Sequence, residues 1–161
     1  MAVNNIIKRI QNIMRQDAGI NGDAQRIEQM TWMFFLKVYD TQEETWEYKD
    51  ENYKSIIPED LRWRKWAVDE KDGEALTGEA LLSFVNEKLF PTLKNLPIDA
   101  NTPRAKSIVL ETFADLNQYM KNGTLLRQVV NIVNEIEFDD ADDRHTFGDI
   151  YEGILKDLQM F

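Results

Sequence analysis

The chain has 161 residues, of which 43% are hydrophobic and 30% charged, the balance of one folded domain rather than of a disordered tail. It contains no cysteine, which excludes disulfides, cysteine-ligated zinc and a thiol nucleophile. Its 29 acids and 19 bases give a net charge of −10, which argues against a domain that binds nucleic acid over its whole surface.

The charge is unevenly distributed along the chain. Residues 1–16 contain three cations and no acid, whereas residues 134–161 contain nine acids and two cations. The longest apolar block, residues 32–36, is far too short to span a bilayer, and no apolar run follows the N-terminal charges as in a signal peptide. We therefore expect a soluble, cytoplasmic protein with no membrane partner.

Apolar residues near the N-terminus recur at steps of three and four, which predicts a first helix. They are Ile6, Ile7, Ile10, Ile13 and Met14. Gly19 and Gly22 mark a loop, and Asp23 is predicted to cap the second helix.

The second helix is predicted to be buried on several sides, because residues 32–36 are apolar without interruption. One face carries Ile27, Met30, Phe34 and Val38. An acid-rich end is expected to face solvent, with Asp40, Glu43, Glu44 and Glu47.

The remaining apolar pattern is also helical. After an irregular region over residues 52–78, a third helix follows Thr77 and is expected to be disturbed or to end near Phe90, before Pro91. The next helix begins at Thr102-Pro103 and is expected to stop near Asn122-Gly123. Its inner residues would be Val109, Phe113, Leu116 and Met120.

Two more helices complete the prediction. Thr124 would cap one that is lined by Leu126, Val129, Val130, Val133 and Ile136. The last helix would carry Tyr151, Ile154, Leu155 and Leu158. The sequence therefore predicts an all-α, compact bundle of five to seven helices, forming one domain over residues 1–161, with one irregular aromatic and basic connection.

The chemistry of catalysis is missing from the sequence. The single histidine, His145, cannot form a His-rich metal site, and the seven glycines never occur as Gly-x-Gly. No Gly-Lys-Ser/Thr or Gly-x-Ser-x-Gly motif occurs, and the acids at 139–143 lack the spacing of a calcium loop. We predict no catalytic, cofactor-binding or metal-binding residue, so this domain is not expected to be an enzyme by itself.

One segment interleaves basic and aromatic residues: Arg62-Trp63-Arg64-Lys65-Trp66. The two tryptophans are three residues apart, and we expect them to anchor one turn to the core while the bases project outward. Arg62, Arg64 and Lys65 are then the candidate contact for DNA or another anionic partner.

Three segments together resemble the modification subunit of type I restriction–modification systems. They are residues 26–40, which carry the family's Phe-Leu-Lys…Asp pattern; residues 123–138, which end in Ile-Glu-Phe; and residues 147–155, which read Phe-Gly-Asp-Ile-Tyr-Glu-Gly-Ile-Leu. Their order and spacing fit over nearly the whole chain. The resemblance implies the N-terminal helical domain of a DNA N6-adenine methyltransferase subunit.

In that family a catalytic domain follows, with a Gly-rich S-adenosylmethionine loop and an Asn-Pro-Pro-Phe-like motif for the extruded adenine. The four prolines here are never adjacent, so the resemblance places that domain and its cofactor beyond residue 161. It also implies as partners a specificity subunit, a second modification subunit, a restriction subunit and double-stranded DNA in the assembled complex.

Two alternatives remain open from the residues alone. The acid-rich C-terminal third is compatible with a stand-alone acidic helical protein that mimics DNA and blocks DNA-binding enzymes. A helical protein–protein adaptor without any nucleic-acid link would have the same composition.

Overall fold

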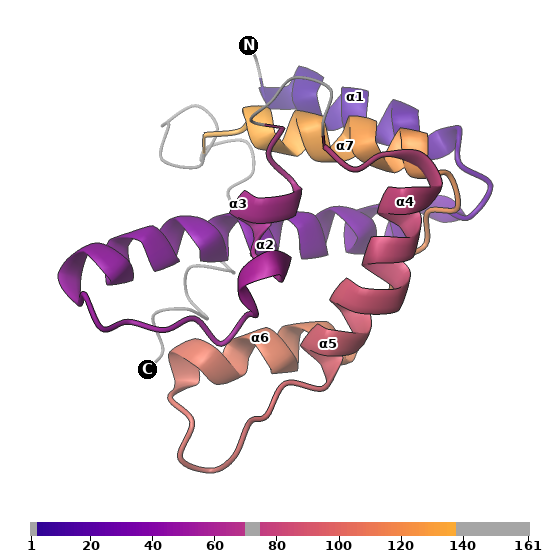
Figure 1. The fold of residues 1–161 in the computed structure, drawn as a ribbon. Coiled ribbons are helices and arrows are strands. Elements are labelled where there is room, and N and C mark those ends of the chain that lie inside the picture. Colours follow the sequence, from indigo (N-terminus) through magenta and orange to yellow (C-terminus); the bar gives the residue numbers. More distant parts are fainter. Residues whose placement is uncertain (1–2, 70–74, 138–161) are drawn as a thin grey trace.

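The computed structural model describes residues 3–69 and 75–137, and all regular structure within these ranges is helical (Figure 1). The α-helices are α1 (Val3–Arg15), α2 (Gly22–Lys49), α3 (Trp63–Trp66), α4 (Gly78–Ser83), α5 (Phe90–Lys94), α6 (Arg104–Ala114) and α7 (Gly123–Glu135). A 3-10 turn, η1 (Glu59–Leu61), precedes α3, and a π-helical segment, η2 (Phe84–Leu89), joins α4 to α5. The all-α prediction is confirmed. His145, the acids at 139–143, residues 147–155 and the predicted last helix lie outside the described residues.

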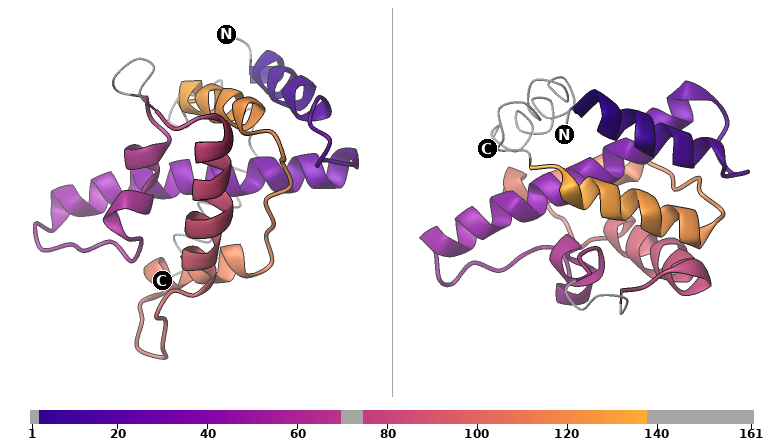
Figure 2. Two further views of the ribbon diagram at one scale, coloured as in Figure 1. Left: turned by 45° about the vertical axis from the view of Figure 1, so that its right-hand side comes forward. Right: turned by 90° about the horizontal axis from the view of Figure 1, so that it is seen from above.

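The 28-residue helix α2 crosses the molecule and organises the core. Helices α1 and α7 pack together on one side of it and α6 lies on the opposite side (Figures 1 and 2). Every residue from 32 to 36 is at most 2% exposed, so the predicted burial on several sides is confirmed. The prediction for Ile27 is wrong, because it is 51% exposed: none of residues 22–28 is buried, and α2 enters the core only at Gln29.

The apolar stripes of α1 and α7 lie where their spacing predicts. Ile6, Ile10 and Met14 are buried in α1, and all five apolar residues predicted for α7 are buried. The caps differ from the prediction: α2 has Asn21 at its N-cap, and Asn122 rather than Thr124 caps α7 by accepting a hydrogen bond from the Leu125 N–H at 3.0 Å. These shifts of one or two residues leave the buried faces unchanged.

Helices α4 and α7 approach each other closely at their first residues. A Cβ built on Gly123 would lie 1.8 Å from the carbonyl oxygen of Gly78, so no side chain fits at this crossing. Gly78 itself has a φ of 57°, a conformation that side chains rarely adopt. The close approach of α4 and α7 therefore requires glycine at position 123, and the positive φ favours glycine at position 78.

The helix that starts at α4 is disturbed near Phe90, as predicted, and does not end there. It continues through η2 and α5 to Lys94, and Pro91 is the second residue of α5. In an α-helix the proline ring would clash with the carbonyl four residues earlier. The π-helical turn before Pro91 widens the backbone and accommodates the ring, so the proline disturbs the helix without ending it.

Residues 115–122 are not helical, although their apolar spacing predicts a helix. Helix α6 starts at Arg104, one residue later than predicted, and ends at Ala114. The Lys94 ammonium caps this end by donating to the carbonyls of Phe113 (2.8 Å), Ala114 (3.2 Å) and Leu116 (2.7 Å). A cation at a helix C-terminus satisfies carbonyls that have no partner within the helix.

The extended segment after α6 has its backbone N–H groups bound by side chains of other elements. Glu28 accepts from Asn117 N at 2.8 Å and Gln29 accepts from Tyr119 N at 2.8 Å, both from α2. The loop after α1 supplies Asp17, whose 4% exposed carboxylate accepts from the backbone N–H groups of residues 19, 121 and 122 at 2.8–3.1 Å. These acceptors replace the carbonyls that a continuing helix would have provided.

Among the described helices, none combines the length and the apolar character that crossing a bilayer requires.

Candidate functional site

The two tryptophans of the basic segment are core anchors, as predicted. Trp63 and Trp66 are 3% and 4% exposed, and Trp66 stacks on Trp32 with ring centroids 6.5 Å apart. Their indole N–H groups are both satisfied: Trp63 donates to the side-chain oxygen of Asn134 at 2.8 Å, and Trp66 to the carbonyl of Leu61 at 3.0 Å. Helix α3 is thereby fixed between α2 and α7.

Arg62 does not project outward. It is 8% exposed, and its guanidinium forms ion pairs with Glu47, with Glu43 at 3.6 Å and with Glu59 at 3.5 Å. A guanidinium enclosed by three carboxylates is not available to a phosphate. Arg62 therefore acts inside the domain, joining α3 to α2.

Arg64 and Lys65 are more exposed. Arg64 Nε donates to Asp40 Oδ1 at 2.9 Å, Nη1 donates to Glu47 Oε2 at 3.2 Å, and a quarter of the side chain is exposed. Lys65 is half-exposed, with its ammonium 3.3 Å from Glu59. The three cations of the segment thus face four carboxylates of their own chain.

The acids of α2 were expected to face solvent, and for two of them this is wrong. Asp40 is 7% exposed and Glu43 is fully buried, because Asp40 turns towards Arg64 and Glu43 towards Arg62. Residues 40, 43 and 47 follow the three- and four-residue spacing of one helical face. That spacing marks one face of α2, and only the placement of Arg62 and Arg64 against this face shows that it forms an ionic cluster.

The ionic cluster consists of Arg62, Arg64 and Lys65 with Asp40, Glu43, Glu47 and Glu59. Burial has the largest effect on the pKa values of its inner carboxyls. It raises the pKa of the Glu43 and Asp40 carboxyls above the usual range, and hydrogen bonds from Tyr53 and Arg64 oppose the increase. The Tyr53 hydroxyl donates to Glu43 Oε2 at 2.6 Å, and its pKa is raised by burial and by this carboxylate. At the exposed edge, the hydrogen bond from Arg62 lowers the pKa of Glu47.

A second cationic surface lies on α1. Its exposed residues Asn5, Lys8, Asn12 and Arg15 follow steps of three and four, and we name them the α1 face. Helix α1 contains no acid, and neither Lys8 nor Arg15 makes an ion pair with a described residue. Its third cation, Arg9, lies 3.1 Å from Glu135 of α7. The α1 face is therefore cationic and rich in amides on an otherwise acidic domain.

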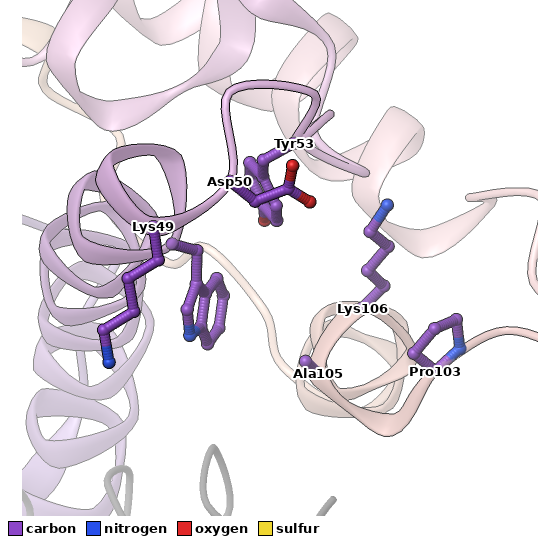
Figure 3. Close-up of a pocket in the computed structure, with 7 residues that line it drawn as sticks. Lys49, Asp50, Tyr53, Pro103, Ala105 and Lys106 are labelled. Atoms are coloured by element: carbon purple, nitrogen blue, oxygen red, sulfur yellow. The ribbon is translucent and has the colours of Figure 1, made fainter.

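A pocket of about 310 Å³ lies between the last turn of α2 and the first turn of α6 (Figure 3). The α2 side consists of Trp46, Lys49 and Asp50, the α6 side of residues 103, 105 and 106, and Tyr53 completes the wall. Trp46 and Tyr53 pack with ring centroids 5.8 Å apart. The lining is thus mainly aromatic and aliphatic, with charges at its edge.

Within residues 3–69 and 75–137, no three His, Asp or Glu side chains are arranged to hold a metal ion.

Residues 3–133 match the family described as the HsdM N-terminal domain. The chain belongs to the HsdM N-terminal domain family. The resemblance to type I modification subunits is thereby confirmed. The chain is also 55% identical, over 161 residues, to the type I restriction enzyme EcoEI methylase subunit of Escherichia coli. That match covers 99% of this chain and 32% of the relative, so the chain spans about one third of the length of the methylase subunit.

Two solved structures share the fold of this HsdM N-terminal domain. One is a modification subunit of a putative type I restriction enzyme from Vibrio vulnificus YJ016, at 30% identity and a TM-score of 0.76, covering 98% of this chain and 35% of that one. The other comes from work on complex assembly and conformational transition of the type I R-M system, at 33% identity and a TM-score of 0.76, covering 96% and 30%.

Proposed function

We propose that this chain is the non-catalytic N-terminal domain of a DNA N6-adenine methyltransferase subunit, and that it supports assembly of the subunits and their closure around DNA. The family match over residues 3–133 carries the proposal, and the fold shared with a modification subunit and with a chain from the type I R-M system supports it. In this proposal, S-adenosylmethionine and the transfer chemistry belong to the rest of the subunit. A cytoplasmic location follows from a role on intracellular DNA.

The partners we propose are a specificity subunit, a second modification subunit and a restriction subunit, with double-stranded DNA enclosed in the complex. The domain would contribute a rigid helical body, since α2 is packed on several sides. Sequence reading would belong to the specificity subunit, because contacts to the DNA backbone set position but carry no sequence information.

For the DNA contact we propose two surfaces. The first is the basic segment, in which Lys65 and the exposed quarter of Arg64 remain as candidates beside the enclosed Arg62. The second is the α1 face, which the charge distribution favours: Lys8 and Arg15 have no carboxylate partner among the described residues, whereas each cation of the basic segment has one. Amide side chains beside cations are the usual phosphate contacts.

Salt dependence tests the two surfaces separately. Binding of the assembled methyltransferase to a duplex containing its target is measured between about 50 and 200 mM salt, where each phosphate contact contributes about 0.9 to the log–log slope. We expect the double variant Lys8→Glu, Arg15→Glu to lower the slope by about two. We expect Lys65→Glu to lower it by about one, and Lys88→Glu, whose partner is Asp60, to leave it unchanged.

The outcomes are distinct. An unchanged slope in the double variant rejects the α1 face, and an unchanged slope in Lys65→Glu rejects the basic segment. If the isolated 161-residue chain inhibits a complete type I enzyme when added in trans, the chain acts as a DNA mimic and the scaffold proposal is wrong.

A further inference from the structure

The C-terminal end of α7 is capped by a partly buried lysine of α2. Helix α7 lies against α2 (Figures 1 and 2), and the Lys37 ammonium donates to the carbonyls of Val133 at 2.9 Å, of Asn134 at 2.8 Å, and of Ile136. The three N–H donors of the ammonium thus meet carbonyls that the last turn of a helix leaves without partners. The helix dipole also favours a cation at this end.

Two other elements hold the same turn of α7. The Asn134 side chain accepts from the Trp63 indole at 2.8 Å and donates to the Ala67 carbonyl at 2.8 Å, which ties it to α3 and its C-cap. Arg9 of α1 lies 3.1 Å from Glu135. The point at which the chain leaves α7 is therefore bound to α1, α2 and α3 at once, so its position and direction are fixed by the domain.

Lys94 makes the same kind of cap on α6, and the comparison separates two roles. Each lysine donates to three carbonyls at the end of a neighbouring helix. After α6 the chain returns to the core, where Met120 is 1% exposed, and other side chains bind its backbone. After α7 the chain continues to residues 138–161 and, in the proposed function, to the catalytic domain. A change at Lys94 therefore acts within the domain, whereas a change at Lys37 acts on its connection to the rest of the subunit.

We infer that Lys37 is a positioning residue: by fixing the end of α7, it sets the orientation of this helical domain relative to the catalytic domain that follows, and so the fraction of subunits arranged to close around DNA. The inference rests on the proposed function, because it requires a catalytic domain in the full-length subunit. Two of the segments that resemble the modification subunit, residues 26–40 and 123–138, meet at this contact. When the competent arrangement is less populated, the apparent affinity for DNA falls by that fraction, whereas the transfer step in the closed complex is unchanged.

The test removes each lysine cap in the full-length modification subunit, assembled with its specificity subunit. Methyl transfer to a duplex containing the target is measured at saturating S-adenosylmethionine, which gives kcat and the KM for DNA. Lys37→Met removes the ammonium and keeps the apolar stem, and Lys94→Met is the matched control on α6. Lys37→Gln keeps an NH₂ donor for part of the cap and is the milder variant. Circular dichroism of each purified variant verifies its helical content.

We expect Lys37→Met to raise the KM for DNA about fivefold or more with kcat within about twofold, Lys37→Gln to give an intermediate KM, and Lys94→Met to leave both within about twofold. If Lys37→Met has an unchanged KM, or if Lys94→Met raises the KM as much, the inference is wrong and the proposed function stands. A lower kcat at unchanged KM also overturns the inference, because Lys37 would then act on the transfer step. If Lys37→Met does not fold, the KM of Lys37→Gln decides in the same way. If the unmodified assembly methylates no adenine, the proposed function itself fails.

Discussion

The buried carboxylate of Asp17 links two segments that are far apart in the chain, and replacing it measures how much this link stabilises the fold. It joins the loop after α1 to the extended segment before α7, accepting from the backbone N–H groups of Gly19 (2.8 Å), Lys121 (2.9 Å) and Asn122 (2.9 Å). The side chain is 4% exposed. Replacing Asp17 with alanine therefore leaves three backbone donors without their acceptor.

The magnitude follows from those three donors. A buried donor left unsatisfied costs about 1–3 kcal/mol. Since water can reach part of this site, we expect Asp17→Ala to lower the free energy of unfolding by about 3–5 kcal/mol, against a total of about 5–15 kcal/mol for a domain. Asp17→Asn keeps one acceptor oxygen but turns an NH₂ group towards the donors, so we expect a loss of about 2–3 kcal/mol.

The assay is urea unfolding of the chain, combined with hydrogen exchange of the Lys121 and Asn122 amides. With a denaturant dependence of about 2 kcal/mol per molar, the alanine variant should unfold at a urea concentration about 2 M lower. The same substitution at the exposed Asp115 is the control and should change stability by less than about 0.5 kcal/mol. A loss below about 1 kcal/mol in Asp17→Ala, or unchanged exchange at both amides, would show that the Asp17 carboxylate does not stabilise these backbone donors.

Two further substitutions test the close helix crossing and the ionic cluster. Gly123→Ala should lower the free energy of unfolding by about 3 kcal/mol or more, because the new Cβ meets the Gly78 backbone. The neighbouring substitution Thr124→Ala should have little effect. Equal melting temperatures for the two variants would contradict this expectation. Glu43 has a raised pKa when folded, so the folded state binds its proton more tightly and stability falls as pH rises above the usual glutamate pKa of 4.5. Glu43→Gln should reduce this decline, measured as the unfolding free energy between pH 5 and pH 8, and the part that remains belongs to Asp40, whose pKa is also raised. An identical pH profile in the variant would show that Glu43 does not contribute to it.

The segment after α6 shows where sequence periodicity stops being informative. Met120 is 1% exposed and Leu116 packs against the core, so the apolar spacing identified the buried side chains correctly. The backbone is nevertheless extended, because Glu28, Gln29 and Asp17 supply acceptors that lie about 90 to 105 residues away in the chain. Periodicity records which side chains are buried, and it carries no information about distant hydrogen-bond partners.

The sequence also predicts one part of the candidate site and misses another. The interleaved basic and aromatic residues identified α3 as a distinctive element, and the burial of Trp63 and Trp66 agrees with the expectation. The direction of Arg62 could not be derived, since a charge on a four-residue turn points to solvent unless an acid of another helix reaches it. The acids of α2 do reach it, and this became visible only when both helices were placed.

The helical class, the inner stripes of α1 and α7, the apolar centre of α2 and the family can all be derived from the amino-acid sequence, because each depends on local spacing or on residue identity. Only the tertiary contacts show which charged side chains form ion pairs within the domain, where the backbone stops being helical, and how α2 and α6 enclose a pocket. The partners of polar groups and the walls of cavities come from elements that are far apart in the chain. The buried face of an amphipathic helix, in contrast, follows from the residue spacing within that helix alone.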